Sequence, residues 1–437
     1  MSTTSDGNPD GRKVDDPSLK LVERSEFAPP TEMPKPRVIV AFGFAQFALF
    51  VALLGPPTVS IAIKLTAVVG SDNAPQAAGL VLGVGAIAAL VAGPIFGYLS
   101  DRTTGPWGRR RPWMVGGSVG LALCLLVMAI SDSVPVLIAS WFVAQLVANA
   151  ALSAYLATIA DQIPTHRHAS MSALVNVTQQ AGILVAVYAV SFLSGNMLAI
   201  FMVPAVIGVI GMVLYSLVLP DKPLLVRPPS RGAREWLSLI WVNPREHPDF
   251  AWAFLSRFLF FIGLFLFTSF RLFWMQDRIG LDTDSAAAVV ATGVLIYTVI
   301  LMITGQIAGM VSDRIKRRKP LVFISVAMSA IGFGLLATVD SVAGFYWVEA
   351  LLGIGYGIYF GADLALVIEV LPDPENIAKD LGIFNIANAA PQSLAPLFGA
   401  ILLTIGAGGQ NYTLLYIASA VVALLGAIAI LPVKKVR

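Results

Sequence analysis

Long apolar runs alternate with short polar segments along most of the chain, and each run is about 20 to 30 residues long. An α-helix needs about 20 mainly apolar residues to cross a hydrocarbon layer of roughly 30 Å. The strands of a membrane β-barrel would be about ten residues long and would alternate apolar with polar side chains. The pattern therefore predicts an all-α membrane protein with twelve transmembrane helices, at residues 37–63, 76–100, 113–131, 134–160, 170–193, 197–219, 250–273, 285–311, 320–339, 342–371, 380–404 and 411–431.

The composition agrees with lipid as the main solvent of the chain. Hydrophobic residues make up 57% of the sequence and charged residues 13%, and the mean hydropathy is +0.79. A soluble globular domain is normally about one-quarter charged. The formal net charge of +3 is small, so we expect a lipid bilayer and no nucleic acid as the partner of this chain.

Basic residues gather on one side of the predicted membrane. With the N-terminus in the cytoplasm, 25 of the 29 Lys and Arg residues lie in cytoplasmic segments, and the exceptions are Lys64, Arg257, Arg271 and Arg278. Cytoplasmic loops of membrane proteins carry such an excess of basic residues. We therefore predict a multi-pass protein of the cell membrane, plasma or inner, with both termini in the cytoplasm.

Polar segments divide the chain into two predicted bundles. Residues 1–36 contain six prolines and few apolar side chains, which predicts a disordered cytoplasmic tail. Residues 220–249 form the one long internal connection, a proline-rich cytoplasmic linker. We expect a six-helix bundle on each side of it, at 37–219 and 250–432, and a short cytoplasmic C-terminus at 433–437.

The two predicted bundles repeat short motifs. Ser100-Asp101-Arg102 recurs as Ser312-Asp313-Arg314, and the acid that ends the fourth span, Asp161, recurs as Glu369 at the end of the tenth. The separation between matching positions is nearly the same for both motifs, which indicates a diverged duplication. Two pseudo-symmetric six-helix halves around a central cavity are typical of secondary transporters.

The loop between the second and third spans resembles a known family signature. Its pattern Gly-x-x-Ser-Asp-Arg at residues 97–102 is similar to the signature loop of the major facilitator superfamily, and the resemblance covers nearly the whole chain. The five-residue gap before Gly-Arg-Arg-Arg-Pro at 108–112 resembles the sucrose transporters and the glycoside–pentoside–hexuronide cation symporters. This resemblance implies alternating access, a monomer, and an ion gradient as the energy source with no cofactor.

Charged residues at the cytoplasmic ends of the spans suit a gate. The superfamily resemblance implies that Asp101 accepts hydrogen bonds from the N-terminus of the eleventh span. Asp161 and Glu369 are placed to pair with the arginines of the two loops, in contacts worth about 0–1 kcal/mol each. The alternative is that the arginines only set topology and contact anionic lipid headgroups. The candidate gate residues are Asp101, Arg102, Arg109, Arg110, Arg111, Asp161, Asp313, Arg314, Arg317, Arg318 and Glu369.

Four ionisable residues lie within two predicted spans, where charge is costly and marks function. Arg257 and Arg271 in the seventh span have the same spacing as Glu349 and Asp363 in the tenth, which runs the opposite way. This spacing corresponds to just under four helical turns, a rise of about 21 Å. Two ion pairs can therefore form between the spans, Arg257 with Asp363 and Arg271 with Glu349, and we call each pair a rung. We interpret all four as proton-coupling residues, with Asp363 first. The alternatives are structural ion pairs or, for Arg271 and Lys64, snorkelling to the outer interface.

Uncharged polar side chains recur inside five of the predicted spans, where contact with lipid would penalise them. Amides offer both donors and acceptors, which suits a substrate with neighbouring hydroxyls. Tyr155 is the repeat counterpart of Asp363, so both are expected to face the cavity, although polar residues also hold helices together. Trp252, Trp274 and Trp347 are expected in the interfacial belts. The candidate substrate residues are Gln46, Asn149, Tyr155, Asn176, Gln179, Gln180, Tyr297, Asn385, Asn388 and Gln392.

These features together favour a proton-coupled symporter of a small molecule, a sugar or glycoside. The second span has no acid before Asp101, and related sodium-coupled sugar symporters carry acids there, so we do not expect sodium coupling. The span at 170–193 lacks the arginine of plant-type sucrose carriers, which argues against sucrose itself. The alternative is a proton-driven efflux antiporter for drugs or metabolites. His166, His168 and His247 fall in loops, and no acid–base or metal cluster shares one depth, so we expect neither an enzyme nor a metal site.

Overall fold

The computed structural model describes residues 30–164, 167–221, 223, 242–315, 317–371, 377–406 and 410–434. Within these residues every regular element is helical. Most of the predicted N-terminal tail and most of the central linker lie outside the described residues, so both expectations remain predictions.

The helices follow the predicted spans. Before the central linker they are α2 (Pro36–Gly55), the short π-helix η1 (Pro56–Ser60), α3 (Ile61–Val69), α4 (Ala74–Asp101), α5 (Arg111–Ile130), α6 (Val134–Gln162), α7 (His168–Phe192) and α8 (Met197–Val218). After the linker they are α10 (Pro248–Asp277), α11 (Thr283–Ile315), α12 (Arg318–Leu336), α13 (Val342–Val370), α14 (Ile377–Thr404) and α15 (Tyr412–Ala429).

Eleven segments of the described chain are long and apolar enough to cross a membrane, with α2, η1 and α3 counted as one helix. They correspond to every predicted span except the tenth. That span is the 29-residue helix α13, in which some side chains lie outside the described residues. α13 packs against α11 and α12, so it belongs to the same bundle as its neighbours in sequence.

The first span contains a turn of π-helix at two adjacent prolines. Pro56 and Pro57 have no N–H group and cannot donate to the carbonyls of the preceding turn. The helix widens into η1 over Pro56–Ser60, and the N–H of Ile61 donates to the carbonyl of Pro56. The Thr58 hydroxyl donates to the carbonyl of Leu54 at 2.6 Å. The π-turn thus carries the span past the prolines and on into α3.

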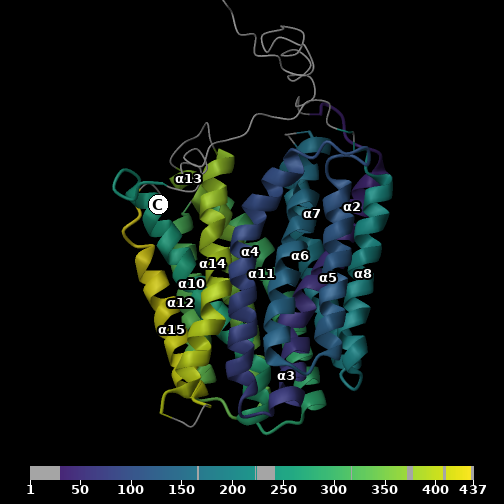
Figure 1. The fold of residues 1–437 in the computed structure, drawn as a ribbon. Coiled ribbons are helices and arrows are strands. Elements are labelled where there is room, and N and C mark those ends of the chain that lie inside the picture. Colours follow the sequence, from purple (N-terminus) through teal and green to yellow (C-terminus); the bar gives the residue numbers. More distant parts are fainter. Residues whose placement is uncertain are drawn as a thin grey trace, which may run out of the picture.

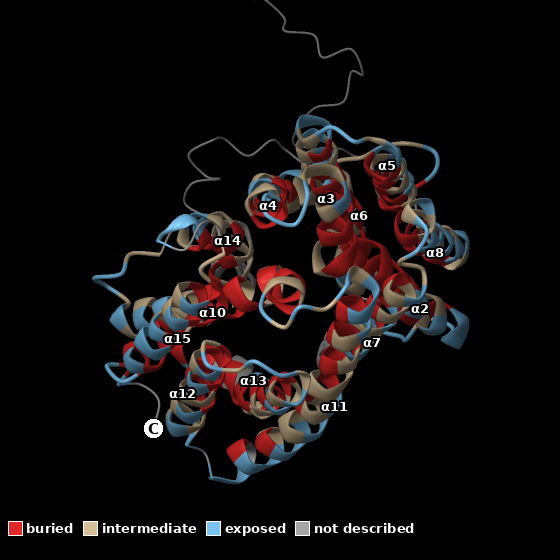
Figure 2. Ribbon diagram, turned by 90° about the horizontal axis from the view of Figure 1, so that it is seen from below, coloured by how far each residue is buried: buried red, intermediate tan, exposed pale blue. Residues whose placement is uncertain are grey.

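The helices pack in two groups, with most contacts inside a group. The first half comprises α2 to α8 and the second half α10 to α15. The main contacts between the halves join α4 to α14 and α7 to α11, and Figure 2 shows both pairs side by side. One end of the bundle carries Arg109–Arg111 and Arg318, and we call it the arginine end. The opposite end, at which α3 finishes, lies at the bottom of Figure 1 and is called the α3 end.

Glycines bring α4 and α14 into close contact at the α3 end. A Cβ atom on Gly79 would lie 2.3 Å from the Cβ of Ala400 and 2.7 Å from the carbonyl oxygen of Pro396. A Cβ atom on Gly83 would lie 2.2 Å from the Cγ of Leu397. Real Cβ atoms do not approach other atoms so closely, so this contact between the halves requires glycine at both positions.

The contact at the α3 end extends into the loops. Gln410, which precedes α15, donates from Nε2 to Oδ1 of Asp72, which precedes α4, at 3.4 Å. Toward the arginine end, by contrast, a Cβ atom on Gly97 of α4 would meet nothing within 4 Å. The two halves are therefore packed tightly where α3 ends, and α4 has free space beside it near the arginine end.

A larger side chain at Gly79 is expected to separate the halves at the α3 end. In a variant in which the single cysteine, Cys124, is serine, D72C and Q410C would be joined by a short bismaleimide, and Gly79→Leu should lower the cross-linking yield several-fold. Gly97→Leu, on the same helix, is the matched control and should leave the yield unchanged. Equal yields in both variants would show that the contact does not depend on glycine at position 79.

Candidate functional site

Two ion pairs join α10 to α13 inside the bundle. Arg257 Nη1 lies 2.5 Å from Asp363 Oδ2, and Arg271 Nη1 lies 3.3 Å from Glu349 Oε1. Both pairings were predicted from the equal spacing of the charges in the two antiparallel spans, and both are confirmed. An ion pair in a low-dielectric interior requires both partners, because removing one leaves the other charge buried alone.

The two pairs differ in how far they are enclosed. The Glu349 side chain is 0% exposed and that of Arg271 is 7% exposed, whereas Asp363 is 10% and Arg257 19% exposed. A Cβ atom on Gly293 of α11 would lie 3.1 Å from the Cγ of Glu349, so α11 closes over this pair. The Arg271–Glu349 pair is therefore interior to the second half, and the alternative that Arg271 snorkels to the interface is wrong.

Aromatic rings surround the more accessible pair. The guanidinium of Arg257 lies 5.0 Å from the ring centre of Phe384 on α14 and 5.5 Å from that of Phe261 on α10. Contacts of this kind stabilise a cation by about 0.5–2 kcal/mol each. Tyr356 and Tyr359 of α13 stack against each other with ring centres 6.1 Å apart. Arg257 and Asp363 thus meet in an aromatic setting that keeps a partial opening.

Lys64 is a further charged side chain buried within a span. It is 4% exposed, and its Nζ donates to the carbonyl of Ala129 at 3.0 Å and pairs with Asp132 at 2.8 Å. The expectation that Lys64 snorkels outward is therefore wrong. The physical reason is that Asp132, in the turn after α5, supplies a counter-ion that allows the ammonium group to stay inside the half.

The structure places Tyr155 in the core of the first half and not at the interface between halves. Its ring is stacked on Phe42 with centres 4.5 Å apart, and its hydroxyl donates to the carbonyl of Phe42 at 2.9 Å. The side chain is 0% exposed. A tyrosine can satisfy its single hydroxyl on a backbone carbonyl and pack as an apolar ring. The prediction that Tyr155 faces a cavity is wrong.

The other predicted substrate residues differ in whether their polar groups have hydrogen-bond partners. Asn149 Nδ2 donates to the carbonyl of Gln145 one turn earlier, at 2.9 Å, so this amide is partly satisfied within α6. The buried oxygens of Gln46 and Asn388 have no donor among the described residues. Tyr297 stacks on Tyr356 with ring centres 6.0 Å apart.

Three amides share one face of α7, because they are spaced i, i+3 and i+4. They are Asn176, Gln179 and Gln180, and all are half-buried. Gln392, on α14, is half-buried as well, and the side chain of Asn385 lies outside the described residues. Their role as substrate ligands remains a prediction.

At the arginine end, the loop before α5 folds onto the end of α6. Asp161 accepts from Arg109 Nη2 at 2.5 Å and from Arg110 Nε at 2.8 Å, and Arg110 also pairs with Asp101 at 2.6 Å. Burial by itself lowers the pKa of Arg110, but the hydrogen bond and charge of Asp161, and then those of Asp101, raise it above its ordinary value. The predicted pairing of Asp161 with the loop arginines is confirmed.

Asp221 completes this cluster and was missed by the sequence reasoning. Its Oδ2 accepts from the backbone N–H groups of Arg110 at 2.7 Å and of Arg111 at 3.1 Å, which caps the start of α5. Arg111 in turn donates to the carbonyl of Leu219 at 2.5 Å. Gly108 has a φ of +98°, and a Cβ atom there would lie 2.3 Å from Asp221 Oδ2, so the loop needs glycine at this position.

The second half repeats this arrangement in a reduced form. Arg318 forms an ion pair with Glu369, and Lys319 donates to the carbonyls of Leu431 and Val433. Arg317, the other predicted partner of Glu369, is an exposed residue at the N-cap of α12. Arg314 is exposed, and the Asp313 side chain lies outside the described residues. Lys319 is the repeat counterpart of Arg111, because these two residues are as far apart in the sequence as Asp161 and Glu369. An alignment of the two repeats could therefore have identified Lys319.

Among the described residues, the ion pairs of the predicted gate lie within a half. Asp101 pairs with Arg110 of its own half, whereas the family resemblance implied a contact with the eleventh span in the other half. That expectation is wrong for this conformation, because Arg110 offers Asp101 a full charge at closer range than a helix end. Arg102 lies over the ring of Tyr98, 5.1 Å from its centre.

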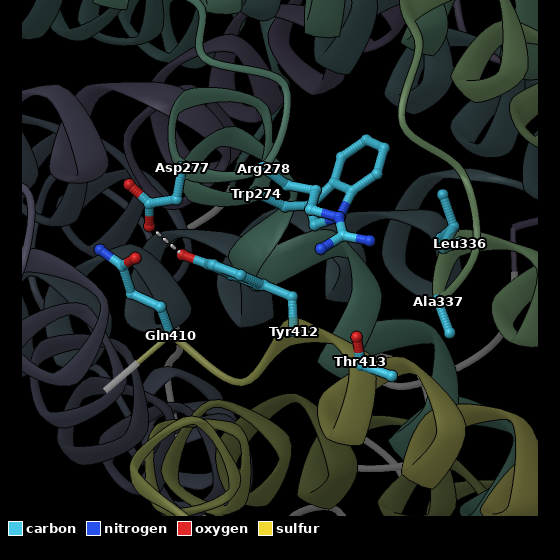
Figure 3. Close-up of a pocket in the computed structure, with 8 residues that line it drawn as sticks. All are labelled: Trp274, Asp277, Arg278, Leu336, Ala337, Gln410, Tyr412 and Thr413. Atoms are coloured by element: carbon cyan, nitrogen blue, oxygen red, sulfur yellow. Dashed lines mark hydrogen bonds between the residues drawn. The ribbon is translucent and has the colours of Figure 1, made fainter. Parts of the chain in front are cut away.

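A small pocket of about 150 Å³ opens at the α3 end of the second half, and none of the four ion-pair residues of α10 and α13 lines it (Figure 3). The hydroxyl of Tyr412 donates to Asp277 Oδ2 at 2.5 Å beside it. Trp274 lines the pocket and is otherwise buried, so its predicted place in an interfacial belt is wrong, while Trp252 and Trp347 are exposed as predicted. The remaining lining residues are Arg278, Leu336, Ala337, Gln410 and Thr413.

Metal-ligand chemistry finds little support in the described part of the chain. No group of three or more His, Cys, Asp or Glu side chains that could hold a metal ion occurs there. Of the three histidines, His247 precedes α10, while His166 and the side chain of His168 lie outside the described residues. Within the described residues, the charged groups that α10 and α13 bring together are the two arginine–carboxylate pairs.

Comparison with known proteins gives a consistent family match. The profile of the Major Facilitator Superfamily matches residues 38–396 and 285–437. The chain is 26% identical over 167 residues to the Uncharacterized MFS-type transporter C18.02 of Schizosaccharomyces pombe, a match that spans 37% of each chain. It is 54% identical over 46 residues to the Uncharacterized symporter sll1374 of Synechocystis, which covers 10% of this chain and 8% of that protein.

Solved structures share the fold. The nucleoside transporter NupG has a TM-score of 0.69 at 16% identity, over 92% of this chain and 99% of that one. A D-xylose-proton symporter has a TM-score of 0.68 at 15% identity, over 91% of this chain and 96% of that one. At such identities the likeness concerns the fold alone.

Loss of Asp161 should destabilise the protein more than loss of Asp101. Asp161→Asn leaves two arginines without their main counter-ion, and the Asp161 side chain is only 20% exposed, so we expect a cost of about 2–4 kcal/mol. The Asp101 side chain is 54% exposed, and Asp101→Asn should cost less than about 1 kcal/mol. Midpoints of thermal unfolding in detergent measure the difference. Equal shifts would contradict the view that Asp161 is the centre of this cluster.

Proposed function

The chain belongs to the Major Facilitator Superfamily, and from this premise we propose that it is a secondary active transporter that moves a sugar or glycoside together with protons by alternating access. The energy comes from a proton gradient, and no cofactor takes part. The predicted location is the cell membrane, with both termini in the cytoplasm, and the predicted working unit is a monomer.

The observation that carries the proposal is the Arg257–Asp363 pair. It is a carboxylate and a guanidinium in direct contact at 2.5 Å, inside helices long enough to cross a membrane, and it is not fully enclosed. A carboxylate held by an arginine can release it when a proton arrives, and the arginine is then free to contact a polar substrate. Proton binding and substrate binding are coupled in this way, because each changes the charge that the other meets.

The fully enclosed pair, Arg271–Glu349, suits a different role. Glu349 is 0% exposed and is covered by α11 at Gly293, which hinders the exchange of a proton with water. We propose that this pair mainly fixes α10 against α13, and that Asp363 is the coupling acid. Of the four proton-coupling candidates from the sequence, this proposal keeps the Arg257–Asp363 pair.

Support for a hydroxyl-rich substrate comes from unsatisfied amides. Asn388 on α14 is one turn from Phe384, whose ring contacts Arg257, and the Asn388 oxygen has no donor among the described residues. Gln46 on α2 has the same property. A buried acceptor without a donor costs about 1–3 kcal/mol, and a sugar hydroxyl would supply the donor. The similarity to a D-xylose-proton symporter and to a short stretch of a symporter fits this class.

Alternating access would use the contacts described above. The tight packing of Gly79 and Gly83 against α14 would close the substrate path between the two halves at the α3 end. The ion pairs of Asp161 with Arg109 and of Glu369 with Arg318 each join parts of one half, so they can hold that half as a unit while the halves move relative to each other. We propose that these ion pairs stabilise the moving units.

Replacing Asp363 should uncouple transport from protons. In proteoliposomes, Asp363→Asn is expected to abolish accumulation of labelled sugar driven by a pH gradient, because an amide cannot carry the proton, while substrate counterflow without a gradient persists. Glu349→Gln removes the other acid with the same geometry and should lower the thermal midpoint but preserve gradient-driven accumulation.

The panel of labelled sugars also tests the function itself. If no sugar shows counterflow with the wild-type protein, the sugar assignment fails. Proton movement on addition of drugs or metabolites would then favour the efflux antiporter. Loss of accumulation in Glu349→Gln but not in Asp363→Asn would reverse the roles of the two rungs.

A further inference from the structure

Arg278, which directly follows α10, is a basic residue on the predicted outer side without a counter-ion among the described residues. Of the four basic residues that the sequence places outside the cytoplasmic segments, Lys64, Arg257 and Arg271 each have a carboxylate oxygen within 3.3 Å. The guanidinium of Arg278 forms neither an ion pair nor a hydrogen bond in the described part of the chain, and the residue is exposed. Its charge is directed at a cavity, because Arg278 lines the pocket of Figure 3.

Two further residues that line the pocket have hydrogen-bond donors without acceptors. Trp274 is 1% exposed, and its indole N–H has no acceptor among the described residues. A buried N–H without a partner is costly, so this group favours a ligand that carries an acceptor. Thr413 is the second residue of α15, and no described residue accepts a hydrogen bond from its N–H or its hydroxyl.

The start of α15 adds to the attraction for negative charge. The first N–H groups of a helix have no acceptor within the helix, and this end carries a partial positive charge. In α15 the N–H of Leu414 donates to Asn411 Oδ1 at 3.0 Å, which leaves the N–H of Thr413 for a ligand. Arginine and a helix N-terminus both bind phosphate oxygens. The donors of this pocket therefore match a ligand with several acceptor oxygens.

The pocket also has an acidic end, which limits the charge of the ligand. Figure 3 shows Asp277 at the hydroxyl end of Tyr412, with Arg278 toward its other end. Asp277 Oδ2 accepts from the hydroxyl of Tyr412 at 2.5 Å. Because the lining holds one arginine and one carboxylate, a second negative charge on the ligand would be repelled by Asp277. A singly charged oxyanion suits this pocket better than a doubly charged one.

The pocket opens beside a surface that faces lipid. Thr413 is exposed, and four apolar residues follow it on the same side of α15, at spacings i+4, i+8, i+11 and i+15. They are Ile417, Val421, Leu424 and Ile428, which are 46–51% exposed. Because α15 is long and apolar enough to cross a membrane, this stripe contacts acyl chains. Thr413 therefore stands where the lipid-facing stripe ends and the headgroup layer begins.

We propose that the pocket binds the phosphate of a phosphodiester, with Arg278 and the start of α15 as its main contacts and Trp274 as a further donor. A membrane phospholipid and a soluble phosphodiester present the same singly charged group. The position at the end of the α15 stripe favours the lipid, whose acyl chains would follow Ile417 while the phosphate fills the pocket. This site is separate from the Arg257–Asp363 pair and does not depend on the proposed function.

Two roles without a ligand compete with this proposal. Arg278 can remain solvated at the membrane surface, or it can attract the carbonyls at the end of α12, where Leu336 and Ala337 line the pocket. Only a binding site makes access to the pocket depend on the concentration of a phosphodiester. Only a site built on Arg278 loses this dependence when the guanidinium is removed.

The experiment measures the protection of a single cysteine in the pocket. In the whole chain with Cys124→Ser, Ala337→Cys places a thiol in the lining without removing a polar side chain. The purified protein in detergent is modified with N-ethylmaleimide in the presence of dihexanoyl phosphatidylglycerol, glycerophosphoglycerol, inorganic phosphate or dihexanoyl glycerol. We expect the phosphatidylglycerol to slow the modification several-fold, and dihexanoyl glycerol, which lacks phosphate, to leave the rate unchanged.

Variants of the arginine test the contact itself. Arg278→Gln should raise the concentration of phosphatidylglycerol that gives half-protection by about tenfold, because it removes a charged donor. Arg278→Lys keeps the charge without the planar fork and should have an intermediate effect. Arg245→Gln, at an exposed arginine before α10, is the matched control and should leave protection unchanged. Phe192→Cys on α7, where the ring is 85% exposed, reports general lipid coverage and should respond in the same way with and without Arg278.

The outcomes identify the source of the phosphate or overturn the site. Protection by phosphatidylglycerol alone assigns the site to a lipid, and equal protection by glycerophosphoglycerol assigns it to a soluble phosphodiester. Stronger protection by inorganic phosphate than by either diester overturns the assignment to a phosphodiester. No protection by any phosphate compound, equal protection by dihexanoyl glycerol, or protection that is unchanged in Arg278→Gln overturns the site, because access to the pocket is then not controlled by an oxyanion on Arg278.

Discussion

A charge in the interior of a membrane bundle needs a counter-charge in the same place, and this constraint organises both halves of the protein. The second half meets it twice between α10 and α13, at Arg257–Asp363 and at Arg271–Glu349. In the first half the buried Lys64 meets it at the edge of the bundle, with Asp132, whose side chain is 82% exposed, and with the carbonyl of Ala129. Because two rungs with equal spacing set the register of two antiparallel helices, α10 and α13 cannot slide past each other without leaving four charges unpaired. The Arg257–Asp363 pair is only partly enclosed, so a proton or a substrate can still reach it.

Glycines decide which helices approach closely enough to move as one. On α11 and α13 the backbones meet directly, since a Cβ atom on Gly357 would lie 1.9 Å from Oγ1 of Thr304 and one on Gly361 would lie 2.6 Å from the carbonyl oxygen of Gly305. Such contacts make the second half a stiff unit around its ion pairs. The contact of Gly79 with α14 is of the same kind but joins different halves. Close packing therefore acts both to hold a half together and to close one end of the interface.

The arginine clusters show how a duplicated chain can diverge without losing its mechanics. Arg110–Asp161 and Arg318–Glu369 are equivalent ion pairs, and Arg111 and Lys319 both donate to the carbonyls at the end of the last helix of their half. Among the described residues, the first half adds a cap on the start of α5 from Asp221, which lies where the central linker begins. The loop before α5 is consequently held by both side-chain and backbone contacts. These contacts also attach it to the start of the linker that leads to the second half.

The sequence by itself determined the helical spans, the repeat and the two rungs, because each depends on a linear spacing. These spacings are a run of apolar residues long enough for a bilayer, motifs that recur at a nearly constant separation, and equal distances between charges in two antiparallel helices. It did not determine where single side chains point. Tyr155 had the right repeat position but packs on Phe42, Lys64 is retained inside by Asp132, and Trp274 is buried under Tyr416 and Phe345. Only the tertiary structure decided these outcomes, because burial and pairing depend on which neighbours other helices bring within a few ångströms. The same reason separates Asp363 from Glu349: their sequence contexts are alike, and only the covering of one by α11 makes them different.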